Sequence, residues 1–248
     1  MSLLDLEGVD AYYDESHILR DVSMRVEEGE VCALLGRNGA GKTTTLRSIA
    51  GAKPPDVRGG SIHFRGEDIT SEDPEDVSSH GISLVPEERR VFPDLTVAEN
   101  LHLAEVVQNR SNTVGRSLPE VHNEGMTTEE VYEEFERLRE RREQKAGTLS
   151  GGEQQMLAIA RALKQNTDLL MLDEPYEGLA PQIIANVEDA IRRISESGTT
   201  ILLVEQNAAA AIKLADRCYV VDQGEIVFDG TAERLRDDEE TRERYLGV

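Results

Sequence analysis

Several features are scarce or missing in this 248-residue sequence. No stretch approaches the roughly 20 apolar residues that a membrane-spanning helix needs, so any link to a membrane must come through a partner. The first ten residues, MSLLDLEGVD, have no basic flank and no long apolar run, which predicts that a secretory signal is absent. The only two cysteines, Cys32 and Cys218, lie in short apolar runs, and we expect both to be buried, reduced thiols.

Positive charge is also scarce. The chain has 27 lysines and arginines against 49 aspartates and glutamates, which gives a formal net charge of −22. Such a charge repels the phosphates of nucleic acids and anionic lipid surfaces, so we expect no nucleic-acid partner. The acidity is spread along the chain and is typical of proteins from a salt-rich cytoplasm, where screening makes it tolerable. This pattern predicts a halophilic source.

Patterns typical of strands and helices alternate along the chain. Alternating or continuous apolar residues predict strands in the first third, including VCALLG at residues 31–36 and GISLVP at residues 81–86. The middle of the chain has helix-spaced apolar residues, and TTEEVYEEFERLRERREQ at residues 127–144 predicts a helix. A polar segment at about residues 107–127 has no periodicity, and we expect an exposed loop there.

Strand patterns return in the last third, where buried strands alternate with helices. Strands separated by helices indicate a mostly parallel sheet. We therefore expect a single α/β domain over residues 1–248. Its core would come from residues 1–88 and 166–248, and a helical lobe from about residues 89–165 would be inserted between them.

The segment GRNGAGKTT matches the phosphate-binding pattern G-x-x-x-x-G-K-[ST]. Its glycines let backbone N–H groups point at phosphates, Lys42 reaches the outer phosphates, and the Thr43 hydroxyl helps to hold Mg²⁺. A simple glycine-rich turn is the alternative, but a predicted buried strand precedes the segment and a helix follows it, as the phosphate loop requires. The expected nucleotide-binding residues are Gly36, Arg37, Asn38, Gly39, Ala40, Gly41, Lys42, Thr43 and Thr44.

Two carboxylates, Asp173 and Glu174, end the buried run LLMLDEP. Strand alternation would point them to opposite sides, so that Asp173 faces the Mg²⁺ and Glu174 faces the attacking water. An ordinary helix N-cap is the alternative for two acids at a strand end. Because a phosphate loop is present, we favour the metal and catalytic roles.

A second glycine-rich segment, LSGGE, comprises Leu149, Ser150, Gly151, Gly152 and Glu153 and lies directly before a helical pattern. Ser150 and Glu153 have the spacing of a capping box. A capping box does not explain two adjacent glycines, which destabilise the first turn of a helix. Backbone N–H groups at a helix start can also bind an anion.

Together, the phosphate loop, LSGGE and LDEP resemble the ATP-binding-cassette ATPases, and the resemblance covers essentially the whole chain. It implies a P-loop NTPase (RecA-like) core, an N-terminal antiparallel β subdomain and an inserted α-helical lobe. It also implies head-to-tail dimers, in which LSGGE closes over the nucleotide held by the partner's phosphate loop. In this family an aromatic residue stacks on adenine, and Tyr13 is favoured over Tyr12 for that position.

The sequence departs from the usual family pattern at two positions. Glu87 stands where a glutamine is usual, and Gln206 stands where a histidine is usual. The resemblance implies that Glu87 acts in catalysis or as a Mg²⁺ ligand, and that Gln206 positions the γ-phosphate and water. VPEERRVFPDLTVAENL, LDEPYEGLAP and LLVEQN resemble the second ATPase subunit of branched-chain amino acid importers. Importers of urea and short amides share VPE and VEQ, and they are the alternative.

Several partners are implied by this resemblance. We expect membrane permease subunits, a second ATPase subunit or a second copy of this chain, and indirectly an extracellular substrate-binding protein. The chain would then act at the cytoplasmic face of the cell membrane as a peripheral subunit. A soluble cassette ATPase not coupled to transport is a further alternative. A GTPase is disfavoured because no N-K-x-D segment is present.

Overall fold

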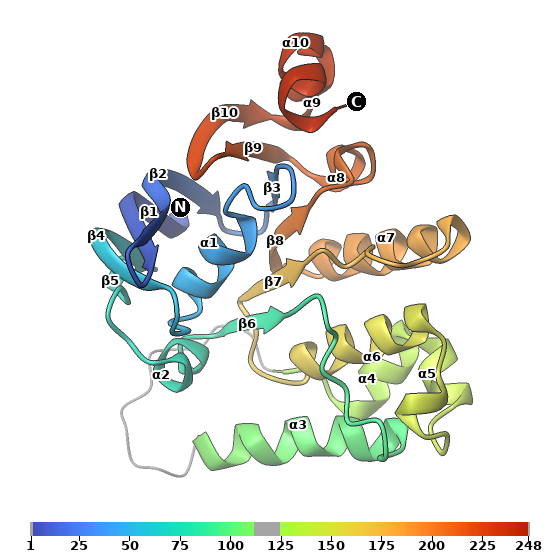
Figure 1. Cartoon of the computed structure of the whole chain (residues 1–248). Coiled ribbons are helices and arrows are strands. Elements are labelled where there is room, and N and C mark those ends of the chain that lie inside the picture. Colours follow the sequence, from blue (N-terminus) through green and yellow to red (C-terminus); the bar gives the residue numbers. More distant parts are fainter. Residues whose placement is uncertain (1, 112–124, 248) are drawn as a thin grey trace.

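The computed structural model describes residues 2–111 and 125–247, and side chains outside residues 107–111 within those ranges (Figure 1). Most of the predicted exposed loop at about residues 107–127 therefore lies outside the described residues. In these ranges, no helix combines the length and apolarity that spanning a membrane would require.

A six-stranded sheet forms the centre of the molecule, in the order β10-β9-β3-β8-β7-β6. The four strands β3, β8, β7 and β6 and the neighbouring β9 run parallel, and β10 pairs antiparallel with β9 at one edge. The strands are β3 (Val31–Leu35), β6 (Ile82–Val85), β7 (Leu169–Asp173), β8 (Thr200–Glu205), β9 (Arg217–Asp222) and β10 (Glu225–Thr231). The predicted mostly parallel sheet is thus confirmed, and every residue of β3 is buried as its apolar run requires.

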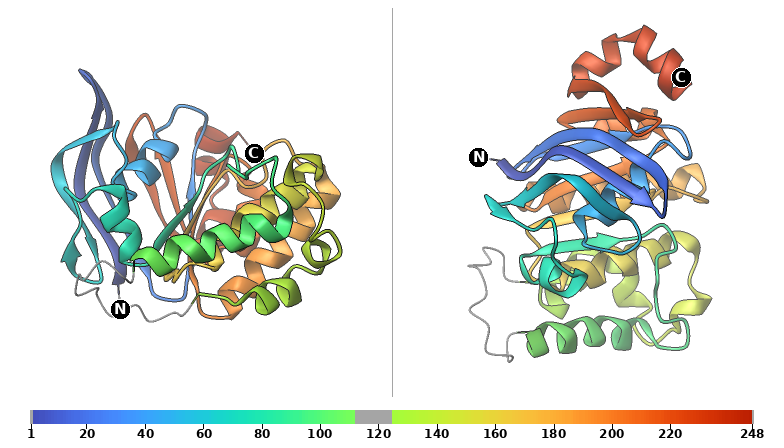
Figure 2. Two further views of the ribbon diagram at one scale, coloured as in Figure 1. Left: turned by 90° about the horizontal axis from the view of Figure 1, so that it is seen from below. Right: turned by 60° about the vertical axis from the view of Figure 1, so that its left-hand side comes forward.

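A second sheet contains only antiparallel strands, in the order β2-β1-β4-β5. Its strands are β1 (Ser2–Tyr13), β2 (Ser16–Glu27), β4 (Asp56–Phe64) and β5 (Glu67–Asp68). Helix α1 (Lys42–Ile49) packs between the two sheets, where Leu46 and Ile49 share one apolar cluster with residues of both (Figure 2). The phosphate loop that leads into α1 is therefore fixed between two sheets.

The helices α3 to α6 lie together below the sheet in Figure 1. They share a second apolar cluster with the opposite face of β3, β7 and β8. The remaining helices flank the sheet or form the upper end of the molecule in Figure 1. The helices are α2 (Pro74–Ser79), α3 (Val97–Ser111), α4 (Thr128–Glu134), α5 (Glu136–Glu140), η1 (Ala146–Thr148), α6 (Gly151–Leu163), α7 (Pro181–Glu196), α8 (Ala208–Leu214), α9 (Ala232–Asp237), α10 (Glu239–Thr241) and η2 (Arg242–Leu246).

The single helix expected over residues 127–144 is wrong, because the chain breaks it at Phe135 and α5 ends at Glu140. This residue has φ −118° and ψ 71°, so α4 ends before it and α5 begins after it. Phe135 and Leu138 are both buried in the core shared with α6, at 3% and 0% exposed. The apolar spacing of the sequence continues through Phe135, so the pattern does not reveal this break.

Both cysteines are buried free thiols, as predicted. Cys32 lies in β3 and Cys218 in the neighbouring β9. Burial raises the pKa of the Cys32 thiol well above its ordinary value and that of Cys218 to about 12. Both groups therefore stay protonated at neutral pH.

Candidate active site

The phosphate loop follows β3 and leads directly into α1. A Cβ atom at Gly36 would lie 2.4 Å from the carbonyl oxygen of Val221, so only glycine fits there. Gly41 has φ +117° and is the N-cap of α1, and no side chain caps this helix start. The first N–H groups of α1 are thus left for an anion.

Lys42 is held in place although its side chain is only 4% exposed. Its Nζ donates to the carbonyl oxygens of Gly36 at 3.0 Å and Arg37 at 3.2 Å, and it lies 3.1 Å from Oε1 of Glu174. A buried ammonium with carboxylate and carbonyl partners is well placed to exchange those partners for phosphate oxygens.

Asp173 and Glu174 both face the phosphate loop. Oδ1 of Asp173 accepts a hydrogen bond from the Thr43 hydroxyl at 3.3 Å, while Glu174 pairs with Lys42. The expectation that strand alternation separates them is wrong, because β7 ends at Asp173 and Glu174 is in the left-handed region with φ +45°.

The environment of Asp173 suits a cation. Burial raises its pKa to about 6, helped by the charges of Glu174 and Glu87, while the hydrogen bond from Thr43 and the charge of Lys42 oppose the shift. A buried carboxylate beside a hydroxyl is the kind of hard oxygen pair that Mg²⁺ prefers, and Mg²⁺ takes few protein ligands besides phosphate and water. The residues present therefore fit a Mg²⁺ ion.

A cavity of about 440 Å³ opens over the phosphate loop. Its wall includes residues from β1 and from the loops after β6 and β7, namely Tyr13, Ile18, Asn38, Gly39, Gly41, Lys42, Thr43, Thr44, Glu87, Glu174 and Glu177. Tyr12 does not line it and instead stacks on His17, with ring centroids 4.2 Å apart. Tyr13 is thus the aromatic side chain of the two that faces the cavity, and Glu87 lies at the same edge.

Gln206 does not line this cavity. It follows β8, is exposed, and borders a neighbouring hollow with Tyr176, Glu177, Glu205 and Asn207. Glu177 lines both spaces. No motif in the sequence pointed to Glu177 or Glu205. The signal for Glu205 was an acid at the end of the apolar run TILLVE, and the structure buries it to 2% exposed.

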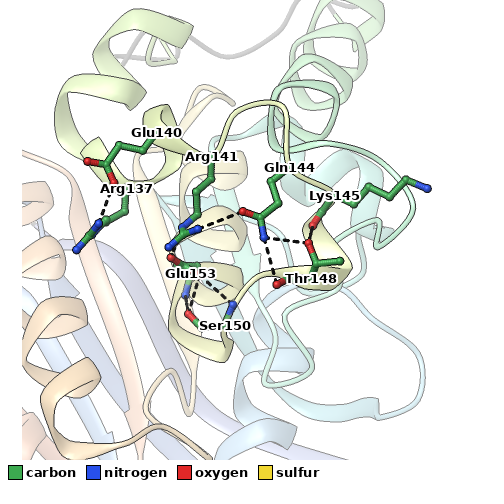
Figure 3. Close-up of polar contacts among 8 residues, drawn as sticks. All are labelled: Arg137, Glu140, Arg141, Gln144, Lys145, Thr148, Ser150 and Glu153. Atoms are coloured by element: carbon green, nitrogen blue, oxygen red, sulfur yellow. Dashed lines mark hydrogen bonds and ion pairs between the residues drawn. The ribbon is translucent and has the colours of Figure 1, made fainter.

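In the second glycine-rich segment, Ser150 and Glu153 hydrogen-bond to each other (Figure 3). The capping box is formed: the amide and hydroxyl of Ser150 donate to Oε2 of Glu153 at 2.9 and 2.8 Å, and the Glu153 amide donates to the Ser150 hydroxyl. Arg141 pairs with the other oxygen of Glu153 at 2.5 Å and donates to Gln144, which donates to Thr148. Ser150 is nevertheless exposed at the surface.

Gly152 has a packing reason in addition, and the contact at Gly151 is with the end of a flexible side chain. A Cβ atom at Gly152 would lie 2.1 Å from Cγ2 of Ile183 in α7, and one at Gly151 would lie 3.0 Å from Nη1 of Arg89. Among the described residues that line the phosphate-loop cavity, none comes from residues 149–153. The structure therefore does not bring the two glycine segments of one chain together.

Comparisons with known proteins agree with this geometry. Residues 19–177 match the family model described as ABC transporter. The chain is 43% identical to the high-affinity branched-chain amino acid transport ATP-binding protein BraG of Pseudomonas aeruginosa, over 99% of this chain and 100% of that protein. It is 36% identical to the probable branched-chain amino acid transport ATP-binding protein LivF of Archaeoglobus fulgidus, over 97% of each chain.

Two further relatives define the breadth of the match. The lipopolysaccharide export system ATP-binding protein LptB of Haemophilus influenzae is 34% identical over 100% of this chain and 98% of that protein. A solved structure of the ADP conformation of an ATP-binding cassette of an ABC transporter superposes with a TM-score of 0.80 at 27% identity, covering 98% of each chain. With an open phosphate loop, a buried lysine and two acids at the end of β7, the chain belongs to the ABC transporter family as an ATP-binding, ATP-hydrolysing subunit.

Proposed function

We propose that this ATPase powers a membrane importer of branched-chain amino acids. The observation that carries the proposal is the 43% identity to BraG over the full length of both chains. LivF, at 36% identity, is described as a probable branched-chain amino acid transport ATP-binding protein. The segments VPEERRVFPDLTVAENL and LLVEQN, which resemble the second ATPase subunit of such importers, support the same assignment.

Export is the second candidate, because LptB is 34% identical over the whole chain. An importer of urea or short amides and a soluble cassette not coupled to transport are further alternatives. The relatives named for branched-chain amino acids have the higher identities among these, and we therefore favour import.

ATP binds with its phosphates on the uncapped start of α1. The adenine stacks on Tyr13, and Lys42 exchanges its contact with Glu174 for the outer phosphates. Thr43 and Asp173, with Glu87 at the edge of the cavity, would hold a Mg²⁺ ion, which would neutralise phosphate charge.

Release of Lys42 frees the carboxylate of Glu174 to accept a proton from the attacking water. Gln206 orients the γ-phosphate and that water. Because Gln206 lies outside the cavity wall, this role requires the loop after β8 to approach the nucleotide, which closure onto a partner can supply.

The partner's nucleotide is held by residues 149–153, from Leu149 to Glu153. Since the two glycine segments of one chain stay apart, we propose a head-to-tail dimer with a companion ATPase or a second copy. This dimer docks on membrane permease subunits at the cytoplasmic face, and a substrate-binding protein delivers the amino acid from outside.

The catalytic assignment is tested with Glu174→Gln. An amide is far too weak a base to take the proton, so the rate of ATP hydrolysis should fall by at least ~100-fold while ATP affinity is kept. Glu240→Gln, an exposed acid in α10, is the control and should leave the rate unchanged. A drop of less than about threefold for Glu174→Gln would assign the base to another residue.

The transport assignment is tested in the source cell. Deleting the gene should abolish high-affinity uptake of labelled leucine, and the wild-type gene should restore it where Glu174→Gln does not. Labelled urea serves as the parallel substrate. Loss of urea uptake with unchanged leucine uptake would replace the amino acid assignment by the amide one.

A further inference from the structure

Glu205 is a buried acid that the mechanism above does not use. It ends β8, its side chain is 2% exposed, and none of the described residues forms an ion pair with it. Burying a carboxylate without a cation is costly, and proteins usually avoid it or compensate it by hydrogen bonds. The contacts of Glu205 with the surrounding site show what compensates this cost.

The carboxylate bridges two loops. Its Oε1 accepts a hydrogen bond from the backbone N–H of Tyr176 at 3.1 Å, and its Oε2 accepts one from the N–H of Asn207 at 3.1 Å. Tyr176 is two residues after Glu174, and Asn207 directly follows Gln206. One side chain thus fastens the loop of the proposed base to the loop of the proposed phosphate-orienting residue.

The position in the sheet extends this link to the phosphate loop. Glu205 lies opposite Leu35, the last residue of β3 before Gly36, and its neighbour Val204 lies opposite Asp173. The N–H of Glu174 also donates to the Val204 carbonyl at 2.9 Å. Glu205 therefore sits where the loops after β3, β7 and β8 meet, behind the reacting groups and out of the nucleotide cavity.

The charge of this carboxylate changes in the physiological range. Burial raises the pKa of Glu205 to about 7, with the charge of Glu174 adding to the shift and the backbone N–H groups opposing it. Two groups act electrostatically with the Glu205 carboxylate, namely Glu174 and the Tyr176 hydroxyl. This hydroxyl is buried without a hydrogen-bond partner in the described part of the chain. Glu188 of α7 acts on Tyr176 in turn. A carboxylate accepts stronger hydrogen bonds than a carboxylic acid, so the bridge weakens as the group gains a proton.

We propose that Glu205 is a positioning residue: its charged carboxylate ties the Glu174 loop to the Gln206 loop, and hydrolysis slows when it is protonated. The inference rests on the roles proposed above for Glu174 and Gln206. The rate of hydrolysis would then depend on pH through Glu205, although the neighbouring Gln206 does not titrate.

The test compares the rates of ATP hydrolysis of wild type and Glu205→Gln from about pH 6 to about pH 8. The two N–H groups meet different oxygens of Glu205, and an amide would place an NH₂ donor against one of them. The rate of wild type divided by the rate of Glu205→Gln should be near one at the acid end of this range. It should rise to about tenfold at the alkaline end, which is the effect of losing one hydrogen bond to a charged acceptor. ATP affinity should stay the same, because Glu205 does not line the cavity.

Asp168→Asn is the matched control. Asp168 is another buried acid, 3% exposed, that directly precedes β7 at the opposite end of the sheet and pairs with Arg65. Its ratio to wild type should not vary with pH. A Glu205→Gln ratio that is equally flat would reduce Glu205 to a structural role and overturn the inference.

A second measurement needs no substitution. Amide hydrogen exchange of Tyr176 and Asn207 in the wild-type chain, corrected for intrinsic rates, should show greater protection at about pH 8 than at about pH 6. The N–H of Glu174 is the internal reference, because it donates to Val204. Equal protection at both pH values would contradict the bridge.

Glu174→Gln in the same assay distinguishes the positioning role of Glu205 from the proposed role of Glu174 as the base. If Glu174→Gln abolishes hydrolysis while Glu205→Gln behaves as wild type, the inference fails and the proposed mechanism stands. If Glu174→Gln hydrolyses normally, the proposed base is wrong, whatever Glu205 does.

Discussion

The phosphate loop and the segment at residues 149–153 are both glycine-rich and both begin a helix, but their helix starts are finished differently. At α1, the N-cap is Gly41 and no side chain accepts from the first turn. At α6, Ser150 and Glu153 satisfy the N-cap amide and the third amide of the helix by themselves. The first N–H groups of α1 are therefore available to an anion. At α6, some of the N–H groups already donate to side chains of the same segment.

A glycine-rich helix start is therefore not by itself a phosphate site. Lys42 adds a buried positive charge at α1, whereas at α6 the capping acid Glu153 adds a negative one, paired with Arg141. A phosphate approaching α6 meets a carboxylate, and Ser150 must turn its hydroxyl away from Glu153 to bind it. The two helix starts thus differ in the charge beside them, and three substitutions test how far the two segments differ.

The largest effect is expected for Lys42→Ala. Removing the ammonium leaves Glu174 without its buried partner and facing the phosphates, so ATP affinity should fall by at least about 100-fold. Equilibrium titration with labelled ATP in strongly saline buffer measures it. Lys53→Ala, at an exposed lysine, is the control. Unchanged affinity in Lys42→Ala would remove the distinction between the two helix starts.

Ser150→Arg should show the opposite pattern, with ATP binding by the monomer kept and assembly lost. The long cation would fill the space where a hydroxyl and N–H groups meet a partner's phosphate. In the Glu174→Gln background, where hydrolysis does not reopen the dimer, light scattering with ATP and the companion subunit should report monomer.

Thr127→Arg is a matched control for this experiment. Thr127 and Glu130 form the same capping box at the start of α4. The substitution removes a cap of similar worth, about 1 kcal/mol, without touching residues 149–153, so the dimer should persist. If Ser150→Arg weakens ATP binding by the isolated chain, residues 149–153 serve the chain's own nucleotide and the head-to-tail proposal is wrong.

A smaller effect is expected for Gly152→Ala. The added methyl would overlap Cγ2 of Ile183, and we expect a loss of about 1–3 kcal/mol of unfolding free energy, as for other overpacked sites. Denaturant unfolding measures it, and Ile183→Ala in the same chain should restore most of the loss. If the single variant is as stable as wild type, the contact does not explain the glycine.

Sequence patterns predicted the parts of the molecule that depend on neighbouring residues. The phosphate loop and the acids after β7 are local motifs, and β3 is a run of apolar residues, so each could be located without a structure. The packing reason for Gly152 depends on Ile183, which is distant in the chain, and the break at Phe135 lies within a continuous helical pattern. Glu205 escaped prediction because a final acid in an apolar run is typical of a strand end that reaches solvent.

The position of Gln206 shows a different limit. The sequence placed it after β8, which is correct, but its relation to the cavity depends on the path of the loop around Tyr176. The predicted role of residues 149–153 is tested by Ser150→Arg, and the roles of Glu87 and Tyr13 remain predictions.

The two buried cysteines make the chain convenient for spectroscopy. Cys32 and Cys218 are shielded in adjacent strands and remain protonated at neutral pH, so maleimide dyes have no natural thiol to modify in the folded state. A single cysteine introduced at an exposed position such as Glu240 or Lys145 can therefore be labelled without first removing native residues. Distances between dyes on two subunits would then follow the opening and closing of the assembly in real time, on the unaltered core of the protein.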